Sequence, residues 1–104
     1  MIGLMALALA ANGMHYDDGN DLLRVCADKA QAQFCLGYAA GMAAGFHLGD
    51  HVAKGHHICL PPKATNGDFQ AVIVSFVTSH PTMRWQPAST LGALALMKAY
   101  PCPK

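Results

Sequence analysis

The feature that most constrains this chain of 104 residues is its set of four cysteines, Cys26, Cys35, Cys59 and Cys102. A chain of this length forms one domain, and an even number of cysteines in a small exported domain is typical of disulfide bonds. The chain has no CxxC pair, so zinc-ribbon and thioredoxin-type motifs are absent. We therefore predict two disulfides, which a domain of this size needs because its apolar core alone is marginally stable.

The N-terminal stretch MIGLMALALAA indicates whether the protein is exported to an oxidising compartment, where these cysteines can form disulfides. It is apolar and contains Ala8-Leu9-Ala10, the small-residue pattern that signal peptidase cleaves. It lacks a basic leader and is too short to span a bilayer, which takes ~20 apolar residues. We predict that residues 1–11 are a truncated signal peptide, and that residues 12–104 form a single periplasmic domain with no membrane insertion after signal removal. An ordinary apolar N-terminal helix is the alternative.

Apolar periodicity predicts four helices and no strand. The predicted helices cover residues 21–30, 33–48, about 68–79 and 87–100. The residues expected to point inward are Leu22, Leu23, Val25 and Cys26 in the first helix, Phe69, Val72, Ile73, Phe76 and Val77 in the third, and Ala88, Leu91, Leu94, Ala95 and Met97 in the fourth. Gly49 is expected to end the second helix, and Asp68 to cap the third. The predicted fold class is thus all-α, a small four-helix domain stapled by disulfides.

The second predicted helix carries Gly37, Gly41 and Gly45 at a spacing of four. Large side chains repeat beside them at the same spacing, and the other face is apolar as well, which is typical of a buried central helix. Three glycines inside a helix cost roughly 1 kcal/mol each relative to alanine. We therefore expect the glycines to allow close packing, either of a neighbouring helix or of a second subunit in a homodimer.

The predicted helices favour one of three disulfide pairings. Cys26 lies late in the first helix and Cys35 early in the second, across a short turn. Cys59 precedes the third helix and Cys102 follows the fourth, so these two meet if the last two helices form an antiparallel hairpin. This arrangement favours Cys26–Cys35 and Cys59–Cys102, while Cys26–Cys102 with Cys35–Cys59 stays open.

Histidines gather between the second and third helices, at His47, His51, His56 and His57. Imidazoles at such spacing can bind zinc, copper or nickel. However, Gly49 is expected to separate the first pair, and solvated loop histidines are the default. A nucleophilic Cys59 activated by His57 would need a free thiol, which a disulfide removes. We predict neither a metal nor a cofactor.

The chain is also poor in catalytic groups. It has no glutamate, four of its six aspartates lie where helices begin, and it has no nucleophile elbow, phosphate loop or dinucleotide fingerprint. Its formal net charge is +1, and no run of Lys or Arg offers a surface for nucleic acid. These features favour a binding protein over an enzyme.

Two segments are candidates for contacting a partner protein. Arg84 and Trp85 are of residue types enriched at interface hot spots. The loop after the second helix, with His51, His56 and His57, is held at Cys59 and could project as a recognition loop. The alternatives are that Trp85 covers the core and that the loop is a passive connector.

Several segments in sequence order resemble the Rap/Tai family of small exported immunity proteins of type VI secretion systems. They are NDLLRVC, FCLGYAAGMAAG, HICLPP, SHP and ALALMKAYPC, which together extend over residues 20–102. The resemblance implies an all-α, disulfide-stapled and often dimeric fold. It also implies inhibition of a peptidoglycan amidase in the periplasm, by obstruction of the amidase's active-site cleft. It assigns no individual contact residue.

Three functional hypotheses follow. The first is a periplasmic immunity-type protein that binds and inhibits an amidase effector. The second is a periplasmic metal-binding module that uses the four histidines. The third is an accessory envelope protein of the same fold without a toxin partner.

Overall fold

The computed structural model describes residues 17–103, and they form four α-helices. The helices are α2 (Gly19–Ala27), α3 (Ala32–Val52), α4 (Asn66–Ser79) and α5 (Ala88–Ala99), with short 3-10 turns η1 (Lys29–Gln31) and η2 (Pro81–Met83). No strand occurs within residues 17–103, so the predicted all-α class is confirmed. The predicted signal peptide, residues 1–11, lies outside the described residues.

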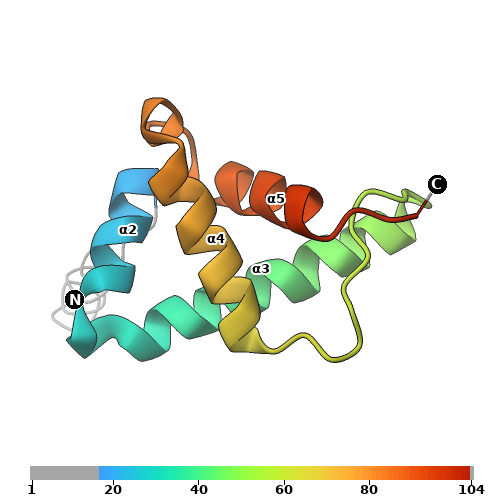
Figure 1. Cartoon of the computed structure of the whole chain (residues 1–104), viewed down its shortest axis with the longest axis horizontal. Coiled ribbons are helices and arrows are strands. Elements are labelled where there is room, and N and C mark those ends of the chain that lie inside the picture. The colour runs from blue at the N-terminus through green and yellow to red at the C-terminus, as the bar shows by residue number, and fades with distance from the viewer. Residues whose placement is uncertain (1–16, 104) are drawn as a thin grey trace, which may run out of the picture.

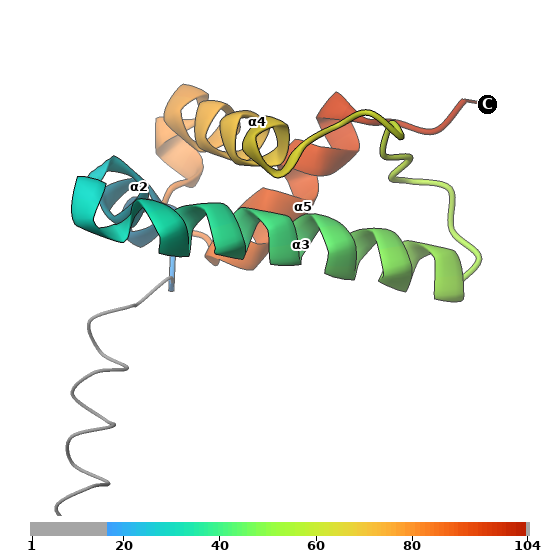
Figure 2. The ribbon, with the colours of Figure 1, turned by 90° about the horizontal axis from the view of Figure 1, so that it is seen from below.

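The longest helix, α3, forms the base of the domain. Figures 1 and 2 show α2, α4 and α5 lying together on one side of it. In Figure 1, α4 crosses this base and α5 lies beside α4. The segment 53–65 returns from the far end of α3 to the start of α4. Among the residues that the structure describes, one side of α3 is therefore covered and the other is not.

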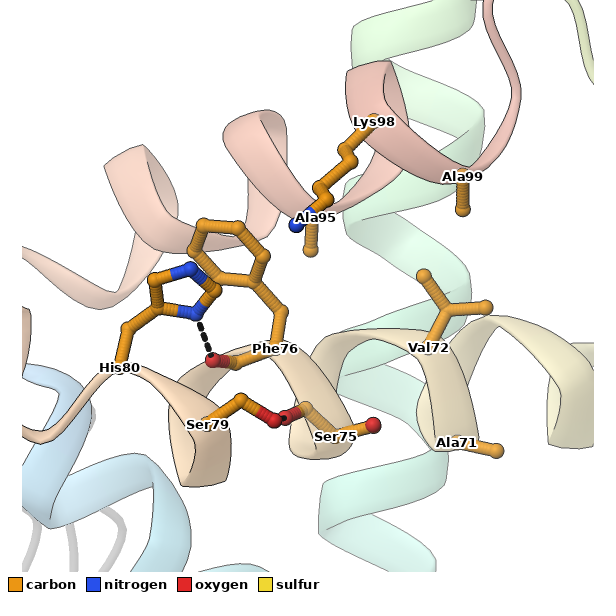
Figure 3. Close-up of a pocket in the computed structure, with 9 residues that line it drawn as sticks. All are labelled: Ala71, Val72, Ser75, Phe76, Ser79, His80, Ala95, Lys98 and Ala99. Atoms are coloured by element: carbon orange, nitrogen blue, oxygen red, sulfur yellow. Dashed lines mark hydrogen bonds between the residues drawn. The ribbon is translucent and has the colours of Figure 1, made fainter.

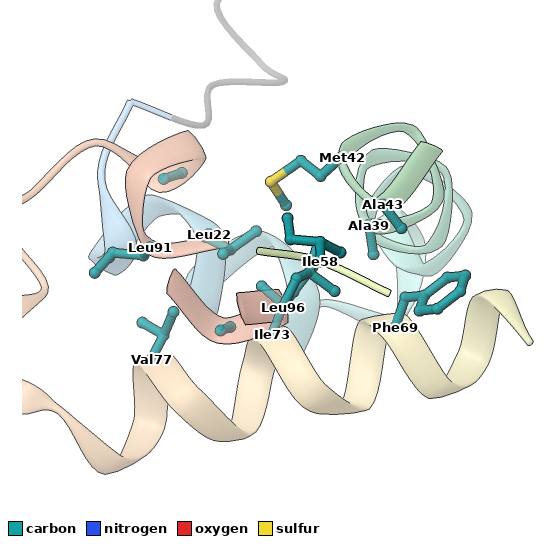
Figure 4. Packing of buried hydrophobic residues seen from close by; sticks show 12 residues of the cluster. Leu22, Ala39, Met42, Ala43, Ile58, Phe69, Ile73, Val77, Leu91 and Leu96 are labelled. Carbon is teal, nitrogen blue, oxygen red and sulfur yellow. The ribbon is translucent and has the colours of Figure 1, made fainter. Parts of the chain in front are cut away.

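The core lies between α3 and the other three helices (Figure 4). Its largest fully buried side chains are Leu22, Ile73, Leu91, Leu96, Val25, Val77 and Cys35. Most of them belong to the predicted inward faces, but Leu96 was not predicted to point inward. Leu94 and Met97 were, and both are only partly buried. The core face of α5 is thus rotated from the predicted one, because α5 packs against both α3 and α4.

The helix starts follow capping boxes. Asp18 caps α2 and accepts a hydrogen bond from the amide of Asp21 at 2.9 Å, while the Asp21 carboxylate accepts one from the amide of Asp18. Thr65 caps α4 and pairs in the same reciprocal way with Asp68. The expectation that Asp68 is the cap was therefore wrong: it is the third helical residue, whose side chain completes the box.

The glycines that allow close helix packing within the chain are not the predicted ones. A Cβ added at Gly37, Gly41 or Gly45 would have no heavy atom of the described residues within 4 Å, apart from the nearby backbone of its own helix. A Cβ added at Gly19 would lie 2.6 Å from Leu91 Cδ1, and one at Gly92 would overlap the Met42 side chain. No neighbouring helix of the described chain therefore packs on the glycine face of α3, and the second subunit stays a prediction.

The prediction that α3 is buried on all sides was also wrong. Ala39, Met42 and Ala43 of this helix face the core. By contrast, Phe34, Leu48 and Val52 are 49%, 61% and 71% exposed. The helix has an almost wholly apolar sequence, so periodicity alone could not tell which side other helices would cover.

Two disulfides join these helices, Cys26–Cys35 and Cys59–Cys102, as the predicted hairpin of the last two helices favoured. The first closes the turn between α2 and α3. The second ties the segment before α4 to the residues after α5, where the Cys59 amide also donates to the Tyr100 carbonyl at 2.8 Å. Within residues 17–103, no helix is both long and apolar enough to cross a membrane.

Candidate functional site

The residues predicted to contact a partner lie on two separate surfaces. The histidine loop follows α3 at one end of the domain, and the Trp85 turn, residues 84–86, lies at the opposite end near α2 (Figure 1). The structure therefore does not bring Arg84 and Trp85 together with His51, His56 and His57 within one chain.

The histidine loop begins where α3 ends, and this end lies later than predicted. Gly49 lies inside α3, and the helix continues to Val52. The helix closes with a Schellman motif, in which the Lys54 amide donates to the backbone carbonyl of His51 and the Gly55 amide donates to the backbone carbonyl of Asp50. Lys54 takes the left-handed conformation, with φ of 59°, that glycine usually adopts in this motif. The missing glycine at this position explains why the sequence did not reveal the true end.

Asp50 clamps the loop back onto the helix. Its carboxylate accepts hydrogen bonds from the amides of His57 at 3.0 Å and Ile58 at 3.1 Å, and from Nδ1 of the His57 ring at 2.9 Å. Because a carboxylate only accepts, the His57 Nδ1 atom must carry a proton. A side chain at Gly55 would overlap the Asp50 carboxylate and would have to displace it from the loop. Buried Ile58 and the Cys59–Cys102 disulfide hold the end of the loop.

These hydrogen bonds lower the pKa of Asp50 below the ordinary value of 3.8, chiefly through the His57 side chain and then through the Ile58 amide. A lowered folded-state pKa means that the clamp contributes stability above the unfolded-state pKa. The contribution is lost only as the pH falls through the lower folded-state value. The loop should therefore stay clamped at neutral and mildly acidic pH.

Replacing Asp50 with asparagine should loosen the loop. Asparagine is uncharged, so its single oxygen gives the two amides weaker hydrogen bonds, and its amide nitrogen cannot accept one from the protonated Nδ1 of His57. We expect hydrogen exchange at the His57 and Ile58 amides to rise about tenfold or more, because their protection depends on local opening. Exchange followed by NMR at pH 6 measures this. Asp28→Asn is the matched control, since Asp28 makes a similar hydrogen bond to the Ala30 amide at the other end of α3. Equal exchange in Asp50→Asn and the unchanged chain would contradict the clamp.

The histidine side chains lie around the end of α3. His47 and His51 lie four residues apart on α3 and line a hollow of about 120 Å³ with Asp50 and His56. Nevertheless, residues 17–103 contain no group of three or more His, Cys, Asp or Glu side chains that could hold a metal ion. The second hypothesis, a metal-binding module, gains no support from this geometry. Cys59 is bonded to Cys102, so it is not a thiol nucleophile beside His57.

The second surface is the Trp85 turn. Arg84 donates from Nε to the Val77 carbonyl at 3.2 Å and from a terminal nitrogen to the Thr78 carbonyl at 2.9 Å, so it caps the end of α4. Trp85 is 73% exposed, which rules out the alternative that it covers the core. The turn is fixed on α2, since Gly19 donates to the Gln86 carbonyl and Asn20 to the Arg84 carbonyl.

A third surface is the uncovered apolar face of α3. It consists of exposed residues three or four positions apart, which share one side of a helix: Phe34, Gly37, Gly41, Ala44, Gly45, Leu48 and Val52. Beside it lies a hollow of about 560 Å³ along the glycines, and a second of about 320 Å³ reaches Leu94 and Met97 on α5. Both hollows are lined by Phe46 and Ser89, so they adjoin. An apolar surface of this extent is typical of a protein interface.

Asp50 is the functional residue that the sequence analysis missed. Its only signal in the sequence is its position in the last turn of a helix, five residues before Gly55. The carboxylate becomes a clamp only after the chain beyond α3 has turned back toward the helix, and local pattern does not predict such a turn.

Comparison with protein-family models assigns the chain to a family. The model of Rap1a immunity proteins matches residues 18–102, a span that includes all four helices and all four cysteines. No curated protein and no solved structure matched the chain. The match covers most of the sequence and agrees with the resemblance noted from its motifs, so the chain belongs to the Rap1a immunity protein family.

Proposed function

We propose that this protein is a periplasmic immunity protein that binds and inhibits a peptidoglycan amidase delivered by a type VI secretion system. The observation that carries the proposal is the family match over residues 18–102. An immunity protein neutralises an effector by binding it, which agrees with the lack of paired catalytic carboxylates and of free cysteines in the described residues. The amidase class comes from the resemblance to the Rap/Tai family.

The two disulfides support export to the periplasm. Disulfides form and persist in oxidising compartments such as the bacterial periplasm and are rare in the cytosol. If residues 1–11 act as a signal peptide, they direct export and are then cleaved. Residues 12–104 would then be released in the periplasm, the compartment that contains the cell wall. An N-terminal sequence of the mature protein that retains residues 1–11 would contradict this route.

The clamped histidine loop supports inhibition by obstruction. Ordering a loop on binding costs affinity, and a loop already held by Asp50, Ile58 and a disulfide avoids most of that cost. His56 and His57 are exposed on this loop. In the proposed complex the loop enters the amidase cleft and blocks substrate without any chemistry of its own.

The apolar face of α3 supports a homodimer. Phe34, Gly37, Gly45 and Leu48 are placed symmetrically about Gly41, seven and four residues to either side. In an antiparallel pair of α3 helices that cross at Gly41, Phe34 of each protomer therefore meets Leu48 of its partner. The glycines meet at the centre, where the backbones can approach closely. A two-fold interface needs this self-complementary pattern.

Such a dimer would unite the two predicted contact surfaces. Within one chain the histidine loop and the Trp85 turn lie at opposite ends of α3. In an antiparallel dimer the histidine loop of one protomer lies at the same end as the Trp85 turn of its partner. A single amidase could then contact both, with Trp85 as a hot-spot anchor.

The direct test looks for an amidase encoded beside this gene and uses it as the partner. Purified chain should inhibit hydrolysis of peptidoglycan by that amidase at stoichiometric concentration. Trp85→Ala should weaken binding by about tenfold or more, as expected for an exposed aromatic hot spot, and Arg24→Ala on α2 is the surface control. Calorimetry and a turbidity assay of cell-wall hydrolysis measure the two effects. An amidase that is neither bound nor inhibited would refute the proposal, and absence of a neighbouring amidase gene would favour the accessory envelope role.

A further inference from the structure

A separate hollow of about 490 Å³ opens between α4 and α5 (Figure 3). Val72 and Phe76 of α4 and Ala95 of α5 give it apolar walls, and Ala71 and Ala99 lie at its edge. Short side chains at three of these five positions leave the space between the helices unfilled. The hollow is shallow and open to solvent.

One wall of the hollow is held rigidly. The His80 ring stacks on Phe76 with ring centroids 4.1 Å apart, and its Nδ1 atom lies 2.7 Å from the Phe76 carbonyl oxygen. Because that oxygen only accepts, Nδ1 is the protonated ring nitrogen. The paired rings therefore form a fixed aromatic surface that needs no rearrangement to receive a ligand.

The rim of the hollow carries an unneutralised positive charge. Lys98 of α5 extends over Ala95 toward the Phe76 and His80 rings (Figure 3). No described residue forms an ion pair with Lys98, and none of the six aspartates, which are the only acidic side chains of the chain, lines the hollow. A cation above an apolar floor is complementary to a carboxylate that adjoins an apolar group.

We infer that this hollow is a docking site for a segment of a partner protein that presents a carboxylate next to an aromatic or branched aliphatic side chain. The apolar side chain would enter between α4 and α5, and the carboxylate would pair with Lys98. A shallow open hollow suits a protein segment better than a small molecule, whose sites enclose most of the ligand surface. The inference rests on the proposed function in naming the effector as the partner.

The docking site remains open in the proposed dimer. It uses Ala95, Lys98 and Ala99 of α5, whereas the hollow beside the glycine face of α3 uses Ser89, Leu94 and Met97 on another side of the same helix. A dimer would therefore present two such sites, each on a protomer's outer surface.

The first test needs no effector. 4-Phenylbutanoate, a phenylalkyl carboxylate, should produce saturable NMR shifts confined to the lining residues, among them Val72, Phe76 and Ala95. Its neutral amide should bind at least about fivefold more weakly, and Lys98→Glu should remove the preference for the carboxylate. Lys63→Glu, which reverses an exposed charge in the segment before α4, should leave the shifts unchanged. Shifts elsewhere in the chain, or equal binding of acid and amide, would overturn the inference.

The second test uses the neighbouring amidase. Lys98→Glu and Ala99→Phe, which places a ring at the exposed edge of the hollow, should each weaken the complex about tenfold, and Lys63→Glu should not. Equal affinity for all four chains would overturn the docking site and leave the proposed function standing. If the unchanged chain does not bind the amidase, the proposed function fails and the fragment test alone decides the docking site. Sedimentation with phosphatidylglycerol vesicles that depends on Lys98 would overturn the protein-segment assignment in favour of a lipid surface.

Discussion

Replacing Cys59 and Cys102 together with alanine should lower the free energy of unfolding by about 4 kcal/mol. These cysteines are 43 residues apart in sequence, so their bond removes much conformational entropy from the unfolded chain. Domains of this size are stable by only about 5–15 kcal/mol, so the loss is a large share of the total. The bond also joins the end of the histidine loop to the end of α5, which no other covalent link does. Without it the loop should become more mobile.

Urea unfolding of the oxidised variants, followed by circular dichroism, measures the loss. Replacing Cys26 and Cys35, which are nine residues apart, provides the comparison, because the shorter ring predicts about 3 kcal/mol from chain entropy. Cys35 is also buried, so its replacement removes packing as well. A midpoint for the Cys59/Cys102 variant that matches the unchanged chain would show that the long ring does not stabilise this fold.

The second large effect is expected at Gly41. Changing Gly41 to leucine should weaken the proposed homodimer by at least about a hundredfold, which corresponds to about 2.7 kcal/mol. A leucine side chain at the centre of the crossing would hold the two α3 backbones apart. The same change should stabilise the single chain by up to about 1 kcal/mol, since glycine disfavours a helix and nothing in the described chain contacts this position.

Sedimentation velocity over a range of concentrations separates the two effects. Gly49→Leu is the matched control, because it replaces another exposed glycine of α3 that no described residue contacts. Gly49 lies outside the set of residues placed symmetrically about Gly41. It should also favour the helix and leave the dimer intact. If the unchanged chain sediments as a monomer at all concentrations, or if Gly41→Leu remains dimeric, the α3 interface is wrong. Loss of amidase binding in Gly41→Leu alone would support the shared contact surface.

Local sequence predicts some helix boundaries of this protein and not others. Thr65, Asp68 and Pro81 mark the ends of α4 because capping and proline effects act within a few residues. By contrast, Gly49 suggested a helix end that does not exist, and Lys54 takes the left-handed position at the true one. Glycine permits a helix end without requiring it. The hydrogen bonds of Asp50 to His57 and Ile58 hold the chain in its turn, and they depend on residues up to eight positions away.

For the candidate surfaces, too, the sequence predicted some features and tertiary packing decided the others. Arg84 and Trp85 were both predicted as contact residues from their residue types, but tertiary packing gives them different roles. Arg84 caps α4, whereas Trp85 stays exposed. The hollow beside Lys98 had no signal in the sequence, because α4 and α5 create it between residues at least 15 positions apart.

By itself the sequence determined the all-α class, the four helices of residues 17–103, the favoured cysteine pairing and the family, since these depend on periodicity, spacing and motif order. Tertiary structure alone decided which side of α3 is covered, which glycines lie at helix contacts and how the histidine loop is held. The physical reason is that α3 is apolar on every side. Its buried side is selected by the shapes of α2, α4 and α5, and a one-dimensional pattern does not contain those shapes.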